Sequence, residues 1–353
     1  RLARGLSVLG ADLSVPDADR LIVHLRDVCE VDVAQLTRPQ PWCPFVYRID
    51  HAHRSPWIAR IFPGVVPLER VRGEAELLRL LEAHGFPAER LASADPISSL
   101  DGCTVLLTRF VRGDLFGDRS FSTVDEALAA LNRLGSMLGR LHELSPSGHA
   151  VPSGVGAWHG DGATGPPRLD AEAALAFLHD VRDRLPDGTA DRHESLHAQL
   201  DHVDVAEGLP TGLIHPDYTG PNIILAEPDD SPVIIDWSGS GIGPRLPSFA
   251  WFLNKVSLRS EPIGDAVDAI VEGYGCHVAL EDRELDRLSA VMRLRPLFQA
   301  TRSFWRAARA GQTPRGAALA WCTDADNDRR DAIAERAVSA LRAQRFRDKP
   351  ARR

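Results

Sequence analysis

Four polar residues near the middle of the chain have the types and the spacing that phosphoryl transfer requires. His215 and Asp217 begin the segment, Asn222 stands five residues after Asp217, and Asp236 closes a later apolar run. Phosphoryl transfer needs a carboxylate that accepts the proton of the attacking hydroxyl, and oxygen ligands that hold Mg²⁺ against nucleotide phosphates. The two aspartates and the asparagine supply these groups.

The elements that must position these residues are short apolar runs joined by turns. Within the segment 215–222, a Gly-Pro pair allows the chain to turn back, so that the carboxylate and the amide point into one cleft. The apolar runs 223–225 and 233–235 predict a β-hairpin. We expect this hairpin to carry Asp236, on its second strand, to the same cleft.

The pattern HxDxxxxN, followed by an apolar strand and Ile-Asp-Trp, resembles the catalytic loop and magnesium-binding strand of aminoglycoside phosphotransferases and of related choline, homoserine-type and fructosamine kinases. The likeness extends in order over most of the chain and includes the Leu-Gly-Arg-Leu-His segment at 138–142. It implies that Asp217 is the general base and that His215 is a buried residue bracing the catalytic loop. It also implies Asn222 and Asp236 as Mg²⁺ ligands, with ATP or GTP as co-substrate.

The length of 353 residues favours two lobes, because single cores stop growing near about 250–300 residues. In the first part of the chain, the residue pattern predicts an N-terminal helix capped by Asp17 or Asp19, strands over 45–49, 57–62 and 104–110, and a helix over 69–84. The rest is mainly helical, beginning with a helix over 123–144. We therefore expect an α+β, bilobal, protein-kinase-like fold with a nucleotide-binding lobe over 1–112 and a catalytic, substrate-binding lobe over 113–353.

The first lobe of such a kinase needs a cation on a strand, held by a carboxylate from a helix. Arg60 is the candidate cation. It alternates with Ile58 and Phe62 along the predicted strand, so the three share a face, and an arginine at a sheet edge or in solvent is the alternative. Glu74 is its expected partner, with Glu76 as the competing choice and a plain surface glutamate as the alternative. Phe110 lies in the segment expected to meet the nucleobase through backbone groups.

A second His-x-Asp sequence, His159-Gly160-Asp161, is an alternative to the candidate loop. Pro166 stands where its asparagine should be, and no apolar strand follows. We expect it to be a loop. For Asp217, Asn222 and Asp236 the alternative role is turn capping, which these residue types favour.

Two departures from the family pattern leave a catalytically weak or inactive ligand-binding protein open as an alternative. The turn 39–44 contains three prolines and no glycine, which removes backbone donors that could hold phosphates. Downstream of Asp236, two expected acidic positions are occupied by Pro244 and Ser248, which we interpret as supporting positions.

Composition excludes several classes of protein. The formal net charge of -8 argues against a nucleic-acid partner, which normally requires a basic face. No apolar run is long enough to span a membrane, and no signal-peptide pattern is present. The odd, scattered cysteines predict neither a disulfide framework nor a zinc site, so a reduced, cytoplasmic protein is expected.

The acceptor is expected to be a small molecule with a hydroxyl group, either an antibiotic or a metabolite, bound between the catalytic loop and the C-terminal helices. Residues 250–353 contain 19 Lys and Arg against 14 Asp and Glu, which disfavours a polycationic aminoglycoside and makes a neutral or anionic alcohol at least equally suitable. Five arginines of this region could contact it, although their spacing is typical of a solvated face: Arg293, Arg295, Arg302, Arg306 and Arg309. Five aromatic residues could line its pocket or belong to the core: Trp251, Tyr274, Phe298, Trp305 and Trp321. The sequence does not indicate an oligomeric state.

Overall fold

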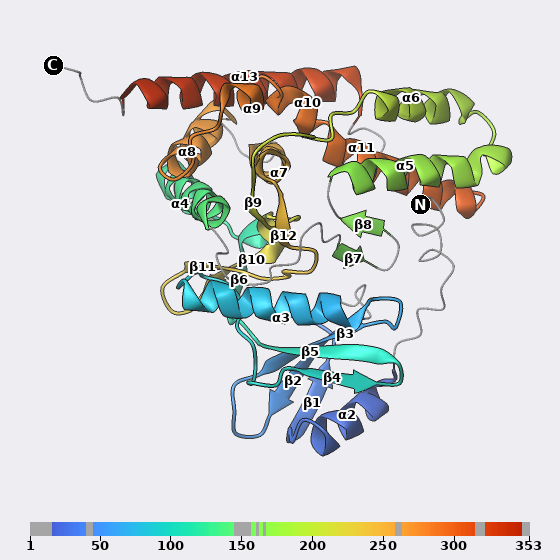
Figure 1. Cartoon of the computed structure of the whole chain (residues 1–353), viewed down its shortest axis with the longest axis vertical. Coiled ribbons are helices and arrows are strands. Elements are labelled where there is room, and N and C mark those ends of the chain that lie inside the picture. The colour runs from blue at the N-terminus through green and yellow to red at the C-terminus, as the bar shows by residue number, and fades with distance from the viewer. Residues whose placement is uncertain are drawn as a thin grey trace.

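In the computed structural model, a small antiparallel sheet forms one end of the molecule and helices form the other (Figure 1). The structure describes residues 16–39, 45–144, 157–159, 162–164, 167–257, 263–314 and 322–347. None of the helices in these ranges is long and apolar enough to cross a lipid bilayer.

The sheet end of the molecule contains five strands in the order β1-β2-β3-β5-β4, with neighbours antiparallel. Its elements are α2 (Ala18–Asp27), β1 (Val33–Thr37), β2 (Val46–His51), β3 (Trp57–Phe62), α3 (Leu68–Ala83), β4 (Ile97–Leu100) and β5 (Cys103–Arg109). The three predicted strands and both predicted helices are present, and Asp17 caps α2 by accepting a hydrogen bond from the Arg20 amide. The edge strands β1 and β4 were not predicted.

The two faces of this sheet serve different purposes. One face packs with α2 around a separate apolar cluster that includes Leu21, Leu25 and Ile49. The opposite side is covered by α3, which lies between the sheet and the helical half of the molecule (Figure 1). The buried leucines of α3 join the main core that continues into the second half. The α3 helix therefore packs against both the sheet and the second half of the molecule.

The second half begins at β6, the first strand after the five-stranded sheet. β6 pairs with β10 in a small three-stranded sheet of order β11-β10-β6. Strands β9 and β12 form another pair. The elements are β6 (Gly113–Leu115), η1 (Phe116–Asp118), α4 (Val124–Glu143), β7 (Ala157–His159), β8 (Gly162–Thr164), α5 (Pro167–Val181), η2 (Arg182–Arg184), α6 (Ala190–Asp201), β9 (Thr211–Ile214), η3 (Gly220–Asn222), β10 (Ile223–Ala226), β11 (Ser231–Ile234), β12 (Gly241–Pro244), α7 (Arg245–Ser257), α8 (Ile263–Gly275), α9 (Asp282–Leu285), α10 (Leu288–Met292), α11 (Leu294–Arg309) and α13 (Asp324–Arg347).

Helix α4 is the central support of this half, and its sequence explains both its start and its packing. Thr123 caps the helix by accepting a hydrogen bond from the Glu126 amide. Gly135 allows the backbone of α8 to approach closely, since a Cβ there would lie 2.2 Å from the Ile270 carbonyl oxygen. Tyr218 of the catalytic loop donates its hydroxyl to the Leu134 carbonyl of the same helix at 3.0 Å. Helix α4 thus contacts the segment 215–222 directly.

Candidate active site

The candidate catalytic loop, residues 215–222, connects β9 to β10 and ends with the short helix η3. Its carboxylate and amide lie side by side, because Asn222 Nδ2 donates to Asp217 Oδ2 at 3.1 Å and to the Asp217 carbonyl at 2.9 Å. On the other carboxylate oxygen, Trp251 Nε1 donates to Asp217 Oδ1 at 2.8 Å and Thr219 Oγ1 donates to it at 3.3 Å. The Asp217 carboxylate is therefore held in one orientation by three side chains.

His215 is fully buried and joins two parts of the site. Its Nδ1 accepts a hydrogen bond from the Asp217 amide at 3.2 Å, so the proton lies on Nε2, which donates to the Ile235 carbonyl at 3.1 Å. Burial lowers the pKa of His215 despite the nearby carboxylates of Asp236 and Asp217, which keeps the ring neutral. His215 is thus buried and bonded within the loop, as expected, and it also joins the loop to the segment that carries Asp236.

Asp236 lies two residues beyond the end of β11, so the expectation that it stands on a strand is wrong. The hairpin itself is confirmed, with Ile223 opposite Ile234. The backbone angle φ of Asp236 is 62°, in the left-handed region that aspartate tolerates better than most residues. The turn is held by two hydrogen bonds: the Ile235 amide donates to the Asn222 carbonyl at 3.0 Å, and the Asp236 amide donates to Glu89 Oε1 at 2.7 Å. A sharp turn, rather than a strand, brings Asp236 beside Asn222.

Arg60 on β3 lies among three carboxylates. Its Nη1 is 2.5 Å from Glu74 Oε1 and 3.7 Å from Asp236 Oδ1, while its Nη2 is 3.3 Å from Glu89 Oε1. The structure thus brings Arg60 and Glu74 together as expected, whereas the rival Glu76 is exposed and pairs with Arg79 on the same helix. Glu89 was not expected at all.

Burial and excess negative charge determine the ionisation of this cluster. The Glu74 side chain is only 5% exposed, and burial raises its pKa to about 7, although the Arg60 guanidinium opposes the shift. Burial also disfavours the charge on Arg60, but Glu89, Asp236 and Glu74 outweigh it and hold the pKa of Arg60 above its ordinary value. One guanidinium among three carboxylates leaves the cluster attractive to a further cation.

The donor set fits Mg²⁺. The two hydrogen bonds that Asn222 makes within the loop use its amide nitrogen, which leaves the side-chain oxygen, a ligand type that Mg²⁺ accepts. Asp236 supplies a carboxylate that is 31% exposed. Across the described part of the chain, no three His, Cys, Asp or Glu side chains converge as a complete metal site. The pair of Asn222 and Asp236 nevertheless suits Mg²⁺, which usually takes one or two protein carboxylates together with phosphate oxygens and water.

The segment around Phe110, directly after β5, is expected to face the nucleobase. The Phe110 amide donates to the Pro56 carbonyl at 3.0 Å, so a nucleobase would have to use a different backbone group of this segment. The Arg48 guanidinium lies 4.4 Å from the centroid of the Phe110 ring.

The two departures from the family pattern have different outcomes. Residues 40–44 of the proline-rich turn lie outside the described residues, as do Gly160 and Asp161 of the second His-x-Asp sequence, while His159 lies on β7. Ser248 is buried and donates to the His215 carbonyl at 3.0 Å. A neutral hydroxyl therefore supports the catalytic loop at one of the positions where an acidic residue was expected.

Arg295 contradicts the interpretation of the C-terminal arginines as a solvated face. It is buried, its Nη1 is 3.1 Å from Asp170 Oδ2, and its Nη2 donates to the Pro216 carbonyl at 2.7 Å. Helical spacing alone could not predict this burial. Arg295 lies at the start of α11, where the helix contacts the loop 215–222 through the Pro216 carbonyl. By contrast, Arg293 is exposed and pairs with Asp331.

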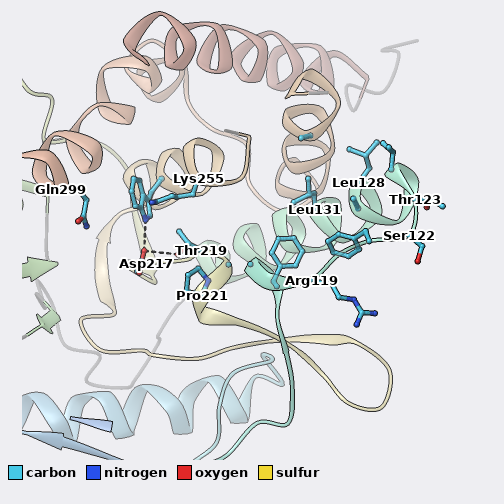
Figure 2. A pocket seen from close by; sticks show the side chains of 18 residues that line it. Arg119, Ser122, Thr123, Leu128, Leu131, Asp217, Thr219, Pro221, Lys255 and Gln299 are labelled. Carbon is cyan, nitrogen blue, oxygen red and sulfur yellow. Dashed lines mark hydrogen bonds between the residues drawn. The ribbon is translucent and has the colours of Figure 1, made fainter. Parts of the chain in front are cut away.

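A cavity of about 660 Å³ opens beside Asp217 (Figure 2). It lies between the catalytic loop, the beginning of α4 and helix α7, with Gln299 of α11 at one end. Of the aromatic residues considered for a pocket, Trp251 lines this cavity, whereas Tyr274, Phe298 and Trp305 belong to the buried cores. The fifth aromatic, Trp321, lies outside the described residues.

A small sheet beside a helical half, with two aspartates and an asparagine gathered at the junction, is the architecture of a kinase-like small-molecule phosphotransferase. The model of the phosphotransferase enzyme family matches residues 44–291, and the chain belongs to that family. No curated protein matches the chain in sequence.

Solved structures of low sequence identity share the fold. An amicoumacin kinase in complex with AMP-PNP, Ca²⁺ and Ami is 14% identical, with a TM-score of 0.61 over 92% of this chain and 94% of that one. A spectinomycin phosphotransferase in complex with ADP and spectinomycin is 14% identical, with a TM-score of 0.58 over 93% and 99%. Choline kinase LicA from Streptococcus pneumoniae is 12% identical, with a TM-score of 0.52 over 93% and 100%. These neighbours include nucleotide complexes and enzymes for unlike acceptors.

Proposed function

We propose that this protein transfers the γ-phosphoryl group of ATP or GTP to a hydroxyl of a small molecule, with Asp217 as the general base and Asn222 and Asp236 as Mg²⁺ ligands. The observation that carries the proposal is the hydrogen-bonded pair of Asp217 and Asn222 with Asp236 adjoining it through the Ile235 amide. The family assignment supports the same reaction class.

In this mechanism, Asp217 receives the proton of the acceptor hydroxyl while the hydroxyl oxygen bonds to the γ-phosphorus. The bond from that phosphorus to the β-γ bridging oxygen breaks, and the nucleoside diphosphate leaves. Bound Mg²⁺ would neutralise charge that develops on the phosphate oxygens. Trp251, Thr219 and Asn222 hold the carboxylate in place, so little reorganisation is needed when the acceptor arrives.

Arg60 is suited to approach the nucleotide phosphates from the sheet side. Glu74 and Glu89 fix its guanidinium by ion pairs at 2.5 and 3.3 Å. Because Glu89 also accepts the Asp236 amide, it couples the position of the phosphate-facing cation to that of the metal-binding carboxylate. We propose Glu89 as a positioning residue for both.

Nucleotide binding tests the proposal and separates it from a binding protein of other specificity. Thermal-shift assays with ATP or GTP, each with and without Mg²⁺, should show Mg²⁺-dependent stabilisation, about 2.7 kcal/mol at a hundredfold excess over Kd. Asp236→Asn, which tolerates the left-handed backbone, should lose most of this gain. Asp229→Asn, at the exposed tip of the same hairpin, should retain it. Absence of stabilisation by either nucleotide would refute the proposal.

A further inference from the structure

Apolar side chains form half of the wall of the cavity beside Asp217. Nine of its eighteen lining residues have apolar side chains, among them Phe116, Phe121, Leu128 and Leu131. In Figure 2, Leu128 and Leu131 face the cavity from α4, across from Asp217. Sites for drug-sized molecules have volumes of about 300–1,000 Å³, and this cavity has that size, with its apolar side chains gathered on Phe116, Phe121 and the first half of α4.

The charges around the cavity are unusual for a site that would hold a polycation. Among the eighteen described lining residues, Asp217 is the one carboxylate, whereas Arg119 and Lys255 are cationic. Arg119 pairs with Asp114 of β6 at 3.2 Å and with Asp230 of the β10–β11 hairpin at 2.7 Å. Lys255 lies on α7, the helix that also carries Trp251.

Trp251 links Lys255 to the base. The Lys255 ammonium lies 4.7 Å from the centroid of the Trp251 ring, and the N–H of the same indole donates to Asp217. Lys255 and Asp217 therefore both contact the Trp251 indole on one wall of the cavity. Lys255 would repel an ammonium group on an acceptor. The only carboxylate that this ammonium group could meet among the described lining residues is Asp217, where it would compete with the reacting hydroxyl.

We propose that the acceptor is an alcohol with a predominantly apolar body and an anionic group, such as a carboxylate, that faces Lys255 while the hydroxyl meets Asp217. This inference rests on the proposed phosphoryl transfer. It assigns Lys255 as a specificity-determining residue, and it assigns the apolar side chains of α4 as the surface that receives the body of the acceptor.

Three probes that share one aromatic body test the assignment: hydroxymethyl-naphthoate, naphthylmethanol and aminomethyl-naphthylmethanol. Isothermal titration would measure the Kd of each, and of kanamycin as a polycation, with the wild-type chain loaded with Mg²⁺ and AMP-PNP. Nucleotide binding is titrated first, so its failure would count against the proposed function and not against the acceptor class. We expect the naphthoate to bind at least about tenfold more tightly than the amine.

Two substitutions test the assigned charges. Lys255→Gln should weaken the naphthoate about tenfold while changing naphthylmethanol by less than about twofold. Val124→Glu, which places a carboxylate on the cavity wall in the first turn of α4, should weaken the naphthoate and strengthen the amine. The matched control is Val23→Glu on α2, since Val23 and Val124 are 55% and 54% exposed.

The control should bind all four probes like the wild type. Tightest binding of the amine or of kanamycin would overturn the proposal. So would the absence of binding by all three naphthyl probes in a protein that does bind nucleotide, or an equal loss of naphthoate and naphthylmethanol in Lys255→Gln.

Discussion

Removal of the Arg60 guanidinium should expose how strongly the sheet and the catalytic half depend on one buried ion cluster. Arg60 is 12% exposed, and its partners Glu74 and Glu89 are 5% and 4% exposed. Replacement of one member of a buried pair typically costs about 3–5 kcal/mol, because the remaining charge stays buried without compensation. We expect Arg60→Met to lower the free energy of unfolding by about this amount at pH 8, where the Glu74 carboxyl with its pKa of about 7 is ionised.

A double-mutant cycle isolates the pair. Glu74→Gln alone should cost less than Arg60→Met, because Glu89 and Asp236 still surround the guanidinium. The double variant should be destabilised by about 2 kcal/mol less than the sum of the two single effects, since the second substitution removes a carboxylate that the first left unpaired. Urea denaturation followed by circular dichroism at pH 8 gives the four free energies.

Arg79 and Glu76 provide the control cycle on the same helix. Their side chains are 41% and 54% exposed, so Arg79→Met and Glu76→Gln should couple by no more than about 0.5 kcal/mol. If the cycle on Arg60 and Glu74 is also additive within about 0.5 kcal/mol, the interpretation of the cluster as a mutually dependent unit is refuted.

Three further outcomes follow from the site. Between pH 4.5 and 7 the folded chain holds the Glu74 proton more tightly than the unfolded chain does, so the contribution of this carboxyl to the unfolding free energy falls by up to about 3 kcal/mol as the pH rises. Glu74→Gln should flatten that decline in urea denaturation measured across this pH range, and an unchanged slope would contradict the raised pKa of Glu74. His215→Phe leaves the Asp217 amide and the Ile235 carbonyl without their partner and should cost about 1–3 kcal/mol for each in chemical denaturation; a neutral effect would show that the ring is not a brace. Arg295→Met should cost about 3–5 kcal/mol and slow phosphoryl transfer, because the buried Asp170 loses its cation and the catalytic loop loses a donor; wild-type melting and turnover would contradict this.

The parts of the site that depend on local chain geometry could be predicted from the sequence. The five-residue interval between Asp217 and Asn222, with a Gly-Pro pair inside it, has few ways to turn, and the structure places the two side chains in hydrogen-bond contact. The hairpin after it follows from two apolar runs and the polar residues between them. Arg60 and Glu74 could be paired because a strand and a helix with clear periodicity present them to one another.

The parts that depend on distant contacts could not be predicted. Glu89 follows the end of α3 without any periodic pattern, yet it accepts the amide of Asp236, which is 147 positions away. Trp251 and Ser248 come from α7, and an apolar helix pattern does not show which of its faces will meet the catalytic loop. Asp236 was assigned to a strand because the apolar run reaches it, but the hydrogen bond that its amide donates to Glu89 stabilises a left-handed turn there instead.

Helical spacing also misled the interpretation of charge. Arg295 shares its residue type and spacing with the exposed Arg293, Arg306 and Arg309, but it points into the protein, where it pairs with the buried Asp170 of α5. The edge strands β1 and β4 carry few consecutive buried residues, so their pairing is determined by the sheet beside them rather than by their own pattern.

Substitution of the base tests the central claim most directly. Asp217→Asn keeps a side-chain oxygen that can accept the Trp251 N–H but cannot take the acceptor proton. The rate at which the labelled γ-phosphoryl group of the nucleotide is transferred, either to water or to an accepting alcohol, should fall by at least about a hundredfold. The Kd for the Mg²⁺-nucleotide complex should change by less than about threefold, a difference below about 1 kcal/mol. Transfer that proceeds in Asp217→Asn at the wild-type rate would contradict the assignment of this carboxylate as the base.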